Sequence, residues 1–521
     1  MEWPSVRNFL HIPSNLTGNN VSIAVVDGYF PPHPDITTND RRLVYLVDMM
    51  SVDVKPELFR ASETPWRSSH GLMTAAAAAG SGSLSSGYYS GAAPDAELYL
   101  LQTGGFNTVE DIETKCTAAL SWIRENWRKF GIRGVVLTVA STRDTGLLPW
   151  QIDPIRMKCE QLAKEGLLVV VASGNTRELT CNGPASSPSV LAVGGVIVPH
   201  EGNQILQYHG CKGITFDGKR IPEILAPAEN IVLPMPFQSI DEYRDHDTAP
   251  YDNLPEGYAR TEGTSFAAPI ILGCAACIWE AHSEWMASQV KTAMFETAIY
   301  KNEWYGSEAG LIQVGAAVSY SADAAIDNRR DDLEPIMTDE LHLVSIIHAK
   351  HHKSSDEVKQ MMFHSNSTKV RAAAICAMAD STFITRGEME DLLRDPSCYV
   401  KMAALFALNN RADIWEHLLG HIAELFKDSD LDLSYCAIKL ASRIEHPFFI
   451  EPLVSGLMND AILQRVSTFG ARCEALQRLT GIFYQPVPEF REGQCFYSER
   501  STESRIHLAL LWQQYITTLR V

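Results

Sequence analysis

The sequence predicts an α/β fold with a mostly parallel sheet flanked by helices, followed by an all-α domain of helical repeats. Three observations predict this arrangement. Short apolar runs alternate with amphipathic helical patterns through the first part of the chain, and a weak repeat with a period of about 30 residues follows in the second part. The length of 521 residues exceeds the size at which one hydrophobic core stops growing, so two domains are expected.

The predicted strands are near-continuous apolar runs. They occupy residues 21–27, 96–103, 134–141, 167–174 and 189–196. Strands covered by helices on both faces have this composition. Helical patterns over residues 108–127 and 153–166 lie between them, and the apolar stripe of the first is formed by Val109, Ile112, Cys116, Leu120, Ile123 and Trp127. Repeated β-α-β units give a mostly parallel sheet, which places its chemistry at the carboxyl ends of the strands.

The domain boundary is predicted where the chain becomes charged and contains a proline, around residues 323–340. We therefore expect a first domain over residues 1–325, a linker over 326–340 and a helical domain over 341–521. Within the latter, Val370, Val400 and Leu433 hold equivalent places in three similar segments, 30 and 33 residues apart. Such periods indicate stacked helix pairs, and these segments resemble HEAT-type repeats, whose usual role is to present a protein-binding surface.

Composition limits the partners and the compartment. The 63 acidic and 44 basic residues give a formal net charge of −19, which repels nucleic acid and anionic lipid headgroups. No run approaches the roughly 20 apolar residues of a membrane span, and the N-terminus lacks the basic and apolar regions of a secretory signal. Eleven scattered cysteines, an odd number, indicate free thiols in a reducing compartment. The sequence thus predicts a cytoplasmic protein without nucleic-acid or membrane partners.

A candidate nucleophilic serine lies in the segment EGTSFAAP, residues 262–269. A serine hydroxyl is a weak nucleophile unless a base takes its proton, a third group orients that base, and donors stabilise the oxyanion. Asp27 closes the first strand, His70 precedes a helix of small residues, and Asn175 follows a later strand. Side chains at strand ends and helix starts of one sheet can converge, so Ser265, His70, Asp27 and Asn175 form a candidate site. Taken alone, Ser265 would be read as a helix N-cap.

These segments, in this order, resemble the subtilisin-like serine proteases. The matching stretches are VSIAVVDGYFPPHPD (21–35), SSHGLMTAAAAAG (68–80), GAAPDAELY (91–99), ASGN (172–175), PASSPSVLAVGG (184–195), ILAPAENI (224–231) and GTSFAAP (263–269). The resemblance covers roughly residues 20–285. It implies that Ser265 is the nucleophile, His70 the general base and acid, Asp27 the residue that fixes the His70 tautomer, and Asn175 an oxyanion donor. We expect Pro269 within about the first turn of the helix, where its missing N–H is tolerated.

The resemblance also implies two substrate-binding segments. They consist of Val139, Ala140 and Ser141, beside which an extended substrate adds as a strand, and of Ala172, Ser173 and Gly174. Residues 138–146, TVASTRDTG, lack the glycine pair that the family commonly has at the first segment, so the preferred substrate residue stays open.

No cofactor is required. Calcium is common in the family, and Asp35 of the HPD stretch matches one ligand position, but residues 81–91 offer no carboxylate or asparagine.

These features predict a cytoplasmic serine endopeptidase that cleaves protein substrates, with the helical domain recognising substrate or binding a regulatory or inhibitory protein. About twenty residues precede the first strand, so the chain looks like the intracellular branch of the family, without a folded pro-domain. The N-terminal segment, the acidic residues 239–257 or the helical domain would then control access. Two alternatives stay open: an inactive pseudoprotease scaffold, and a peptide ligase or macrocyclase that uses the same acyl-enzyme.

Overall fold

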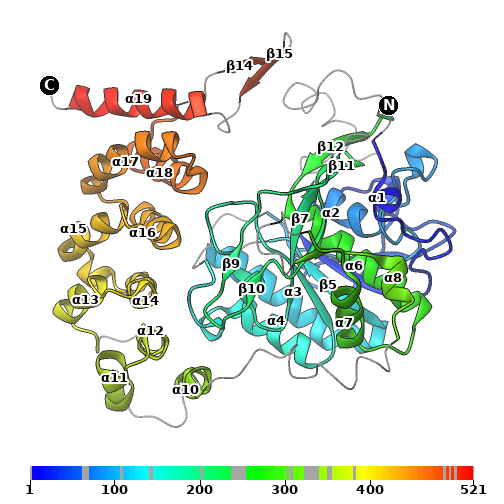
Figure 1. The fold of residues 1–521 in the computed structure, drawn as a ribbon, viewed down its shortest axis with the longest axis horizontal. Helices are drawn as coiled ribbons and strands as arrows, with labels where there is room; N and C mark the ends of the chain where they lie inside the picture. Colours follow the sequence, from blue (N-terminus) through cyan, green and yellow to red (C-terminus); the bar gives the residue numbers. More distant parts are fainter. Residues whose placement is uncertain are drawn as a thin grey trace.

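The computed structural model shows an α/β domain and a helical domain lying side by side (Figure 1). The described residues run from 3 to 519, except 62–69, 106–108, 140–144, 200–203, 236–253, 302–303, 305–308, 322–338, 349–354, 380–382, 485–487, 492–493 and 498–501. Most of the predicted linker therefore lies outside the described residues. Its last two positions, Asp339 and Glu340, already belong to the first helix of the helical domain, α10 (Asp339–His348).

An eleven-stranded sheet forms the centre of the α/β domain. Its order is β12-β11-β7-β6-β5-β1-β4-β2-β3, with β13 beside β11 and β8 beside β7. The strands are β1 (Ser22–Asp27), β2 (Val44–Asp48), β3 (Pro56–Leu58), β4 (Glu97–Gln102), β5 (Ile132–Leu137), β6 (Leu168–Ala172), β7 (Leu191–Ile197), β8 (Leu206–Gln207), β11 (Ile224–Pro234), β12 (Tyr258–Glu262) and β13 (Gly310–Leu311). Pairing is parallel from β2 to β11, whereas β3, β8 and β12 pair antiparallel. The predicted mostly parallel sheet is confirmed.

Helices cover both faces of the sheet, which explains the continuous apolar runs. They are α1 (Val6–Phe9), α2 (His70–Ala79), α3 (Val109–Phe130), α4 (Pro154–Lys164), α6 (Thr264–Ala281), α7 (Ala287–Thr297) and α8 (Val314–Val318). In β1, Ile23 and Val25 join one core with α2 and α6, while Ala24 and Val26 join another with α3 and α4. Because the parallel strands end at one edge, the residues that follow β1, β5 and β6 lie near one another.

The helix α6 is the centre of the larger core. By length and composition alone it would pass as a membrane span, contrary to the expectation that no such run exists, but 83% of that stretch is buried inside the protein. It packs against α2 and against β5, β6, β7 and β11. Its apolar character therefore belongs to a core helix.

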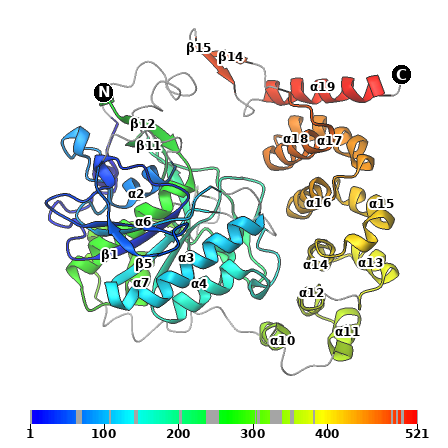
Figure 2. The ribbon, with the colours of Figure 1, turned by 180° about the vertical axis from the view of Figure 1, so that it is seen from behind.

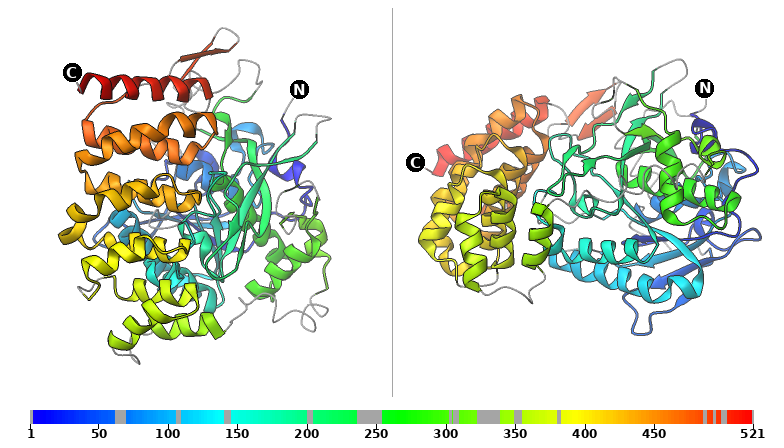
Figure 3. Two further views of the ribbon diagram at one scale, coloured as in Figure 1. Left: turned by 60° about the vertical axis from the view of Figure 1, so that its left-hand side comes forward. Right: turned by 60° about the horizontal axis from the view of Figure 1, so that its bottom comes forward.

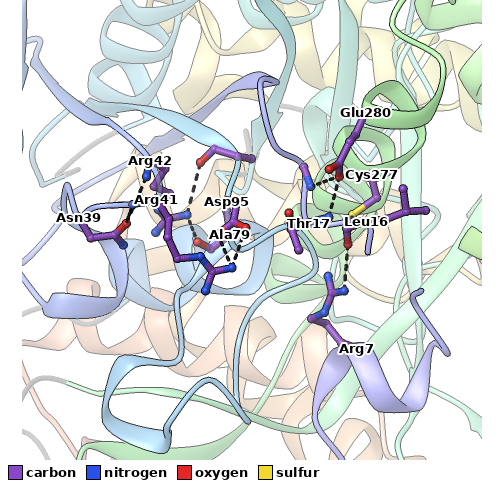
Figure 4. A network of polar contacts seen from close by, with 12 residues as sticks. Arg7, Leu16, Thr17, Asn39, Arg41, Arg42, Ala79, Asp95, Cys277 and Glu280 are labelled. Atoms are coloured by element: carbon purple, nitrogen blue, oxygen red, sulfur yellow. Dashed lines mark hydrogen bonds and ion pairs between the residues drawn. The ribbon is translucent and has the colours of Figure 1, made fainter. Parts of the chain in front are cut away.

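The segment before β1 is fastened to the α/β domain by charged side chains (Figure 4). Arg7 donates hydrogen bonds to the carbonyl oxygens of Ala92, Pro13 and Leu16, and Glu280 accepts from the backbone N–H groups of Thr17 and Gly18. Glu280 lies fifteen residues after Ser265 on α6, about 22 Å along the helix. Residues 7–18 are thus held near the end of α6 that is remote from Ser265, which argues against their acting as a gate.

The helical domain stacks helix pairs in one direction (Figures 1 and 2). After α10 come α11 (Ser355–His364), α12 (Thr368–Ala377), α13 (Arg386–Leu393), α14 (Cys398–Leu408), α15 (Trp415–Leu425), α16 (Leu431–Ile444), α17 (Ile450–Ile462), α18 (Val466–Thr480) and α19 (Thr502–Leu519). The row α12, α14, α16 and α18, called the inner row below, faces the α/β domain. The domain is not wholly α-helical, because a hairpin of β14 (Pro488–Arg491) and β15 (Gln494–Tyr497) precedes α19.

Polar turns before the inner helices repeat the same chemistry. The turn residues Ser365, Asp395 and Asp428 each accept a hydrogen bond from the backbone N–H two residues later, at the start of an inner helix. Arg371 on α12 and Lys401 on α14 form ion pairs with Asp395 and Asp428 of the following turn. The repeat seen in the sequence therefore consists of a buried apolar helix face and a turn bonded to the preceding repeat.

The two domains share a hydrophobic core. Leu147, Leu148 and Phe216 of the α/β domain belong to the same buried cluster as the apolar residues of the inner row. Phe216 lies between β9 (Gly213–Ile214) and β10 (Arg220–Ile221), a two-stranded sheet on the side toward the helical domain (Figure 1). Two further views show the two domains side by side (Figure 3). Separating the domains would expose this apolar surface to water, so their arrangement is part of the folded state.

Candidate active site

Asp27 stands at the carboxyl end of β1 and is almost completely buried. Its Oδ1 accepts a hydrogen bond from the Gly28 N–H at 2.7 Å. Its Oδ2 lies 2.8 Å from His70 Nδ1 and accepts from the hydroxyls of Thr138 at 2.8 Å and Thr74 at 3.0 Å. Burial by itself raises the pKa of Asp27, but His70 and these hydrogen bonds lower it overall, so the carboxylate is ionised.

His70 is the first residue of α2 and remains partly exposed. Its Nδ1 faces Asp27, and its ring lies 5.7 Å from the ring of Phe266, the residue after Ser265. Burial lowers the pKa of His70, but the charge of Asp27 raises it above the ordinary value. Gly71 follows because a Cβ there would lie 2.1 Å from the carbonyl oxygen of Tyr29. Only glycine lets α2 begin this close to the end of β1.

Ser265 is the second residue of α6, where the chain turns from β12 into the helix. Gly263 makes that turn with φ +141°, a conformation that other residues rarely adopt. In the part of the chain that the structure describes, the Ser265 hydroxyl makes no hydrogen bond with His70, as is common before a substrate binds. The expected place of Pro269 is wrong: it is the sixth residue of α6, so it removes the helical hydrogen bond to the Ser265 carbonyl.

Asn175 follows β6 and has a fixed amide orientation. Its Oδ1 accepts hydrogen bonds from the backbone N–H and from the hydroxyl of Thr264, both at 2.8 Å. Because both donors require an oxygen, Nδ2 is on the other side, where a Cβ on Gly263 would lie 3.6 Å from it. Asn175 can therefore donate from Nδ2 beside the turn that carries Ser265.

The predicted substrate-binding residues are only partly within the described chain. Ala172 ends β6, and the backbone N–H groups of Ser173 and Gly174 donate to the Val193 carbonyl and the Thr264 hydroxyl. These two N–H groups therefore already donate hydrogen bonds within the protein. Val139 follows β5 and packs against the core of α3 and α4.

Ala140 and Ser141 lie outside the described residues, as do positions 239–253 of the acidic segment, which was one of three candidates for controlling access.

The sequence did not identify three hydroxyls that support the site: Thr74, Thr138 and Thr264. Thr74 is four residues after His70 on the same helix, so it returns to the same face. Thr138 directly follows β5, which pairs with β1, and its position at a carboxyl strand end was the available signal. Thr264 precedes Ser265. Each hydroxyl holds a functional side chain, not a substrate, and sequence patterns for catalytic groups do not reveal that role.

Asp35 does not fit a calcium site. Its Oδ1 accepts from the N–H and hydroxyl of Ser83, both at 2.7 Å, and its Oδ2 accepts from the Tyr258 hydroxyl at 2.7 Å. Calcium needs a cage of oxygen acceptors, whereas these neighbours are donors to Asp35. Among the described residues, no three His, Cys, Asp or Glu side chains are grouped to hold a metal ion. Asp35 therefore has a structural role here.

A buried carboxylate, an oriented imidazole, a hydroxyl at a helix start and an amide donor are thus brought to one edge of the sheet. Such a set can transfer an acyl group through the hydroxyl and stabilise the oxyanion that forms. A family model described as the subtilase family matches residues 18–333. The chain belongs to the subtilase family.

Relatives with described activities share this region. Serine protease AprX of Bacillus subtilis is 28% identical over 311 residues, and subtilisin E of the same organism is 27% identical over 314. Each alignment covers 58% of this chain, and the chain spans 65% and 66% of the length of these relatives. Fervidolysin of Fervidobacterium pennivorans, a keratinolytic enzyme related to subtilisin, superposes with a TM-score of 0.45 and 18% identity, covering 61% of this chain and 46% of its own.

Proposed function

We propose that the chain is a serine endopeptidase that hydrolyses protein substrates through Ser265, His70 and Asp27. The observation that carries the proposal is the contact of 2.8 Å between Asp27 Oδ2 and His70 Nδ1, at the edge of the sheet where Ser265 lies in the first turn of α6. Membership of the subtilase family supports it, since the similar proteins are named as serine proteases and subtilisins.

In this mechanism His70 Nε2 takes the hydroxyl proton as Ser265 Oγ attacks the peptide carbonyl carbon. His70 then gives that proton to the departing amine, and water releases the acyl group by the same route. Asp27 keeps the His70 Nδ1 protonated and stabilises the imidazolium. The Asn175 Nδ2 and the Ser265 N–H donate to the oxyanion, where the N-terminus of α6 also favours negative charge.

Intact-mass labelling with a fluorophosphonate tests the nucleophile. We expect one adduct on the wild-type chain, mapped to Ser265, and none on Ser265→Ala or His70→Ala. Ser319→Ala is the matched control, because Ser319 is an exposed serine whose hydroxyl donates to the Gly315 carbonyl of α8, the helix directly before it. Absence of label from every variant, the wild type included, would reject the proposal and favour an inactive scaffold.

Product analysis then tests the reaction. Incubation with an unfolded protein, followed by mass spectrometry, is expected to show internal cuts whose new ends carry the elements of water. Cuts confined to chain ends would contradict an endopeptidase. Products joined to an added peptide amine would show that ligation replaces hydrolysis.

The compartment and partners are further parts of the proposal. We infer a cytoplasmic enzyme of the intracellular type, supported by the absence of a disulfide among the described cysteines. The acidic charge argues against nucleic acid and membranes as partners. The helical domain, with HEAT-like repeats, would recognise the substrate or a regulatory protein. Comparing soluble and membrane fractions of cells for the native chain tests the compartment.

A further inference from the structure

Four contacts between the domains follow a pattern. Each involves the second residue of an inner-row helix: Lys369 on α12, Tyr399 on α14, Asp432 on α16 and Ser467 on α18. Lys369 Nζ lies 5.6 Å from the centre of the Phe216 ring, and the Tyr399 ring packs edge-on at 5.6 Å against it. The first turns of the inner row therefore form one continuous edge against the α/β domain.

Two of these contacts fall on the loop that begins with the candidate oxyanion donor. This loop, residues 175–182, is called the Asn175 loop. Its end is bonded to the chain just before its start, because the Asn182 N–H donates to the Ser173 carbonyl at 2.9 Å. Inside it, the Leu179 N–H donates to the Thr176 carbonyl at 3.2 Å. A displacement of Thr180 would thus be passed on to the residues beside Asn175.

Asp432 holds the loop near its end. Its Oδ1 accepts from the Thr180 N–H and its Oδ2 from the Thr180 hydroxyl, both at 3.0 Å. Asp432 is 92% buried, and burial raises its pKa to about 6. The Thr145 hydroxyl and the N–H and hydroxyl of Thr180 lower this pKa, so these neighbours are the visible reason for a buried carboxyl at this place.

Glu178 holds the loop at its middle. Its carboxylate accepts from the Val466 N–H at 2.9 Å and from the Ser467 hydroxyl at 2.8 Å, at the start of α18. The first N–H groups of a helix lack partners within the helix, and its N-terminus favours a negative charge. The loop is therefore bonded to two successive helices of the inner row, once by a side chain of the helical domain and once by its own.

We propose that Asp432 is a positioning residue for the reaction: through Thr180 it fixes the Asn175 loop and so the place of the Asn175 amide. The inference rests on the proposed function. An oxyanion donor acts only from a preorganised place, and a displacement of about 1 Å can reduce a rate by about 100-fold. The helical domain thereby completes the site instead of serving only as a separate recognition module.

Hydrogen exchange of the full chain tests the restraint without using activity. Asp432→Ala and Thr180→Val are expected to raise exchange of the amides over residues 174–182 by about 10-fold, because their bonds to α16 are lost. Asp432→Asn should exchange nearly as the wild type, since its amide can accept from the Thr180 N–H and donate to the hydroxyl. Asp428→Asn is the control, because Asp428 pairs with Lys401 inside the helical domain. Unchanged exchange in both Asp432→Ala and Thr180→Val would overturn the restraint.

Kinetics in two backgrounds test the positioning role. Asp432→Ala should lower the labelling rate of Ser265 and kcat for peptide hydrolysis by about 10-fold, with a smaller effect on KM. In an Asn175→Ala background the same substitution should change the rate less than 2-fold, because the group that it positions is gone. Equal losses in both backgrounds would show a general structural effect and overturn the proposal. If Asp432→Ala does not fold, Thr180→Val replaces it in both measurements.

The two proposals fail in different ways. A wild-type chain that does not label at Ser265 rejects the serine endopeptidase and, with it, the positioning role. Normal labelling that Asp432→Ala and Thr180→Val leave unchanged rejects the positioning role alone.

Discussion

The Thr138 hydroxyl donates to Asp27 Oδ2 at 2.8 Å, the same oxygen that faces His70 Nδ1. Replacing Thr138 with valine keeps the shape and removes this bond to a buried carboxylate. We expect the peptidase rate to fall by about 10-fold and the free energy of unfolding by about 1.5 to 3 kcal/mol, measured by hydrolysis and by denaturant titration. Thr117→Val is the control, since Thr117 bonds only backbone carbonyls on α3. Equal activity of the wild type and Thr138→Val would show that Asp27 needs no such support.

The pH dependence of labelling follows from His70. Only neutral His70 can accept the Ser265 proton, and Asp27 holds the pKa of His70 above its ordinary value despite burial. The labelling rate should therefore rise with pH and reach half its maximum above about pH 6.5. In Asp27→Asn the charge is lost, so the midpoint should move to lower pH while the maximum falls. A midpoint that does not move would contradict the role given to Asp27.

The Asn175 amide is expected to act on the transition state. Asn175→Ala should lower kcat by about 100- to 1000-fold with little change in KM, a magnitude that comes from the oxyanion asparagine of subtilisin itself. Asn126→Ala, which removes an amide bonded to the Trp122 carbonyl on α3, serves as the control. Steady-state kinetics separate the two parameters. A rise in KM at constant kcat would mean that Asn175 binds substrate in its ground state instead.

Calcium removal should have no effect through Asp35. Its oxygens accept from Ser83 and Tyr258, so a chelator should leave the melting temperature and the labelling rate unchanged. Asp35→Ala should destabilise the chain by about 1 to 3 kcal/mol with or without chelator, because the buried Tyr258 hydroxyl and the two donors of Ser83 lose their acceptor. A melting temperature that falls in chelator and recovers with calcium would reveal a cation site elsewhere.

Asp432 should make stability depend on pH. Its pKa is about 6 in the folded chain, raised by burial and further by the nearby Asp430, against an ordinary value of 3.8. The folded state therefore binds more protons than the unfolded state between these values, and this contribution to stability is lost as pH rises through 6. The melting temperature of the wild type relative to Asp432→Asn should fall from pH 4 to pH 7. A constant difference would contradict the raised pKa.

The sequence was sufficient for five strands of the sheet and for the strand ends and helix starts that carry the four candidate groups. Continuous apolar runs predicted β1, β4, β5, β6 and β7, and the strand-end rule placed Asp27 and Asn175 at one edge. His70 is the first residue of α2 and Ser265 the second of α6, as predicted for residues at helix starts. These features depend on local pattern and on the topology of parallel sheets.

The supporting contacts could not be predicted in the same way. The position of Thr138 at a strand end was a signal, but what the fold brings opposite Thr138 and Thr264 was not visible in the sequence. Asp432 stands in an acidic turn that would be read as a solvated helix start, yet its partner Thr180 is 252 residues away. Contacts of this kind depend on how two domains dock, and domain docking cannot be predicted from turn residues or from hydrophobic periodicity.

The four contacts of the inner row lie at equivalent positions in successive repeats, so the helical domain meets the α/β domain at regular intervals. The contacting residues are Lys369, Tyr399, Asp432 and Ser467, at sequence intervals of 30, 33 and 35 residues. Solenoids generally gain or lose repeats easily, because each repeat contacts only its neighbours. Here the loss of one helix pair would bring a serine opposite Thr180 in place of Asp432 and leave Glu178 without its helix. The distance from Phe216 to the Asn175 loop thus fixes how many helix pairs lie between these two contacts.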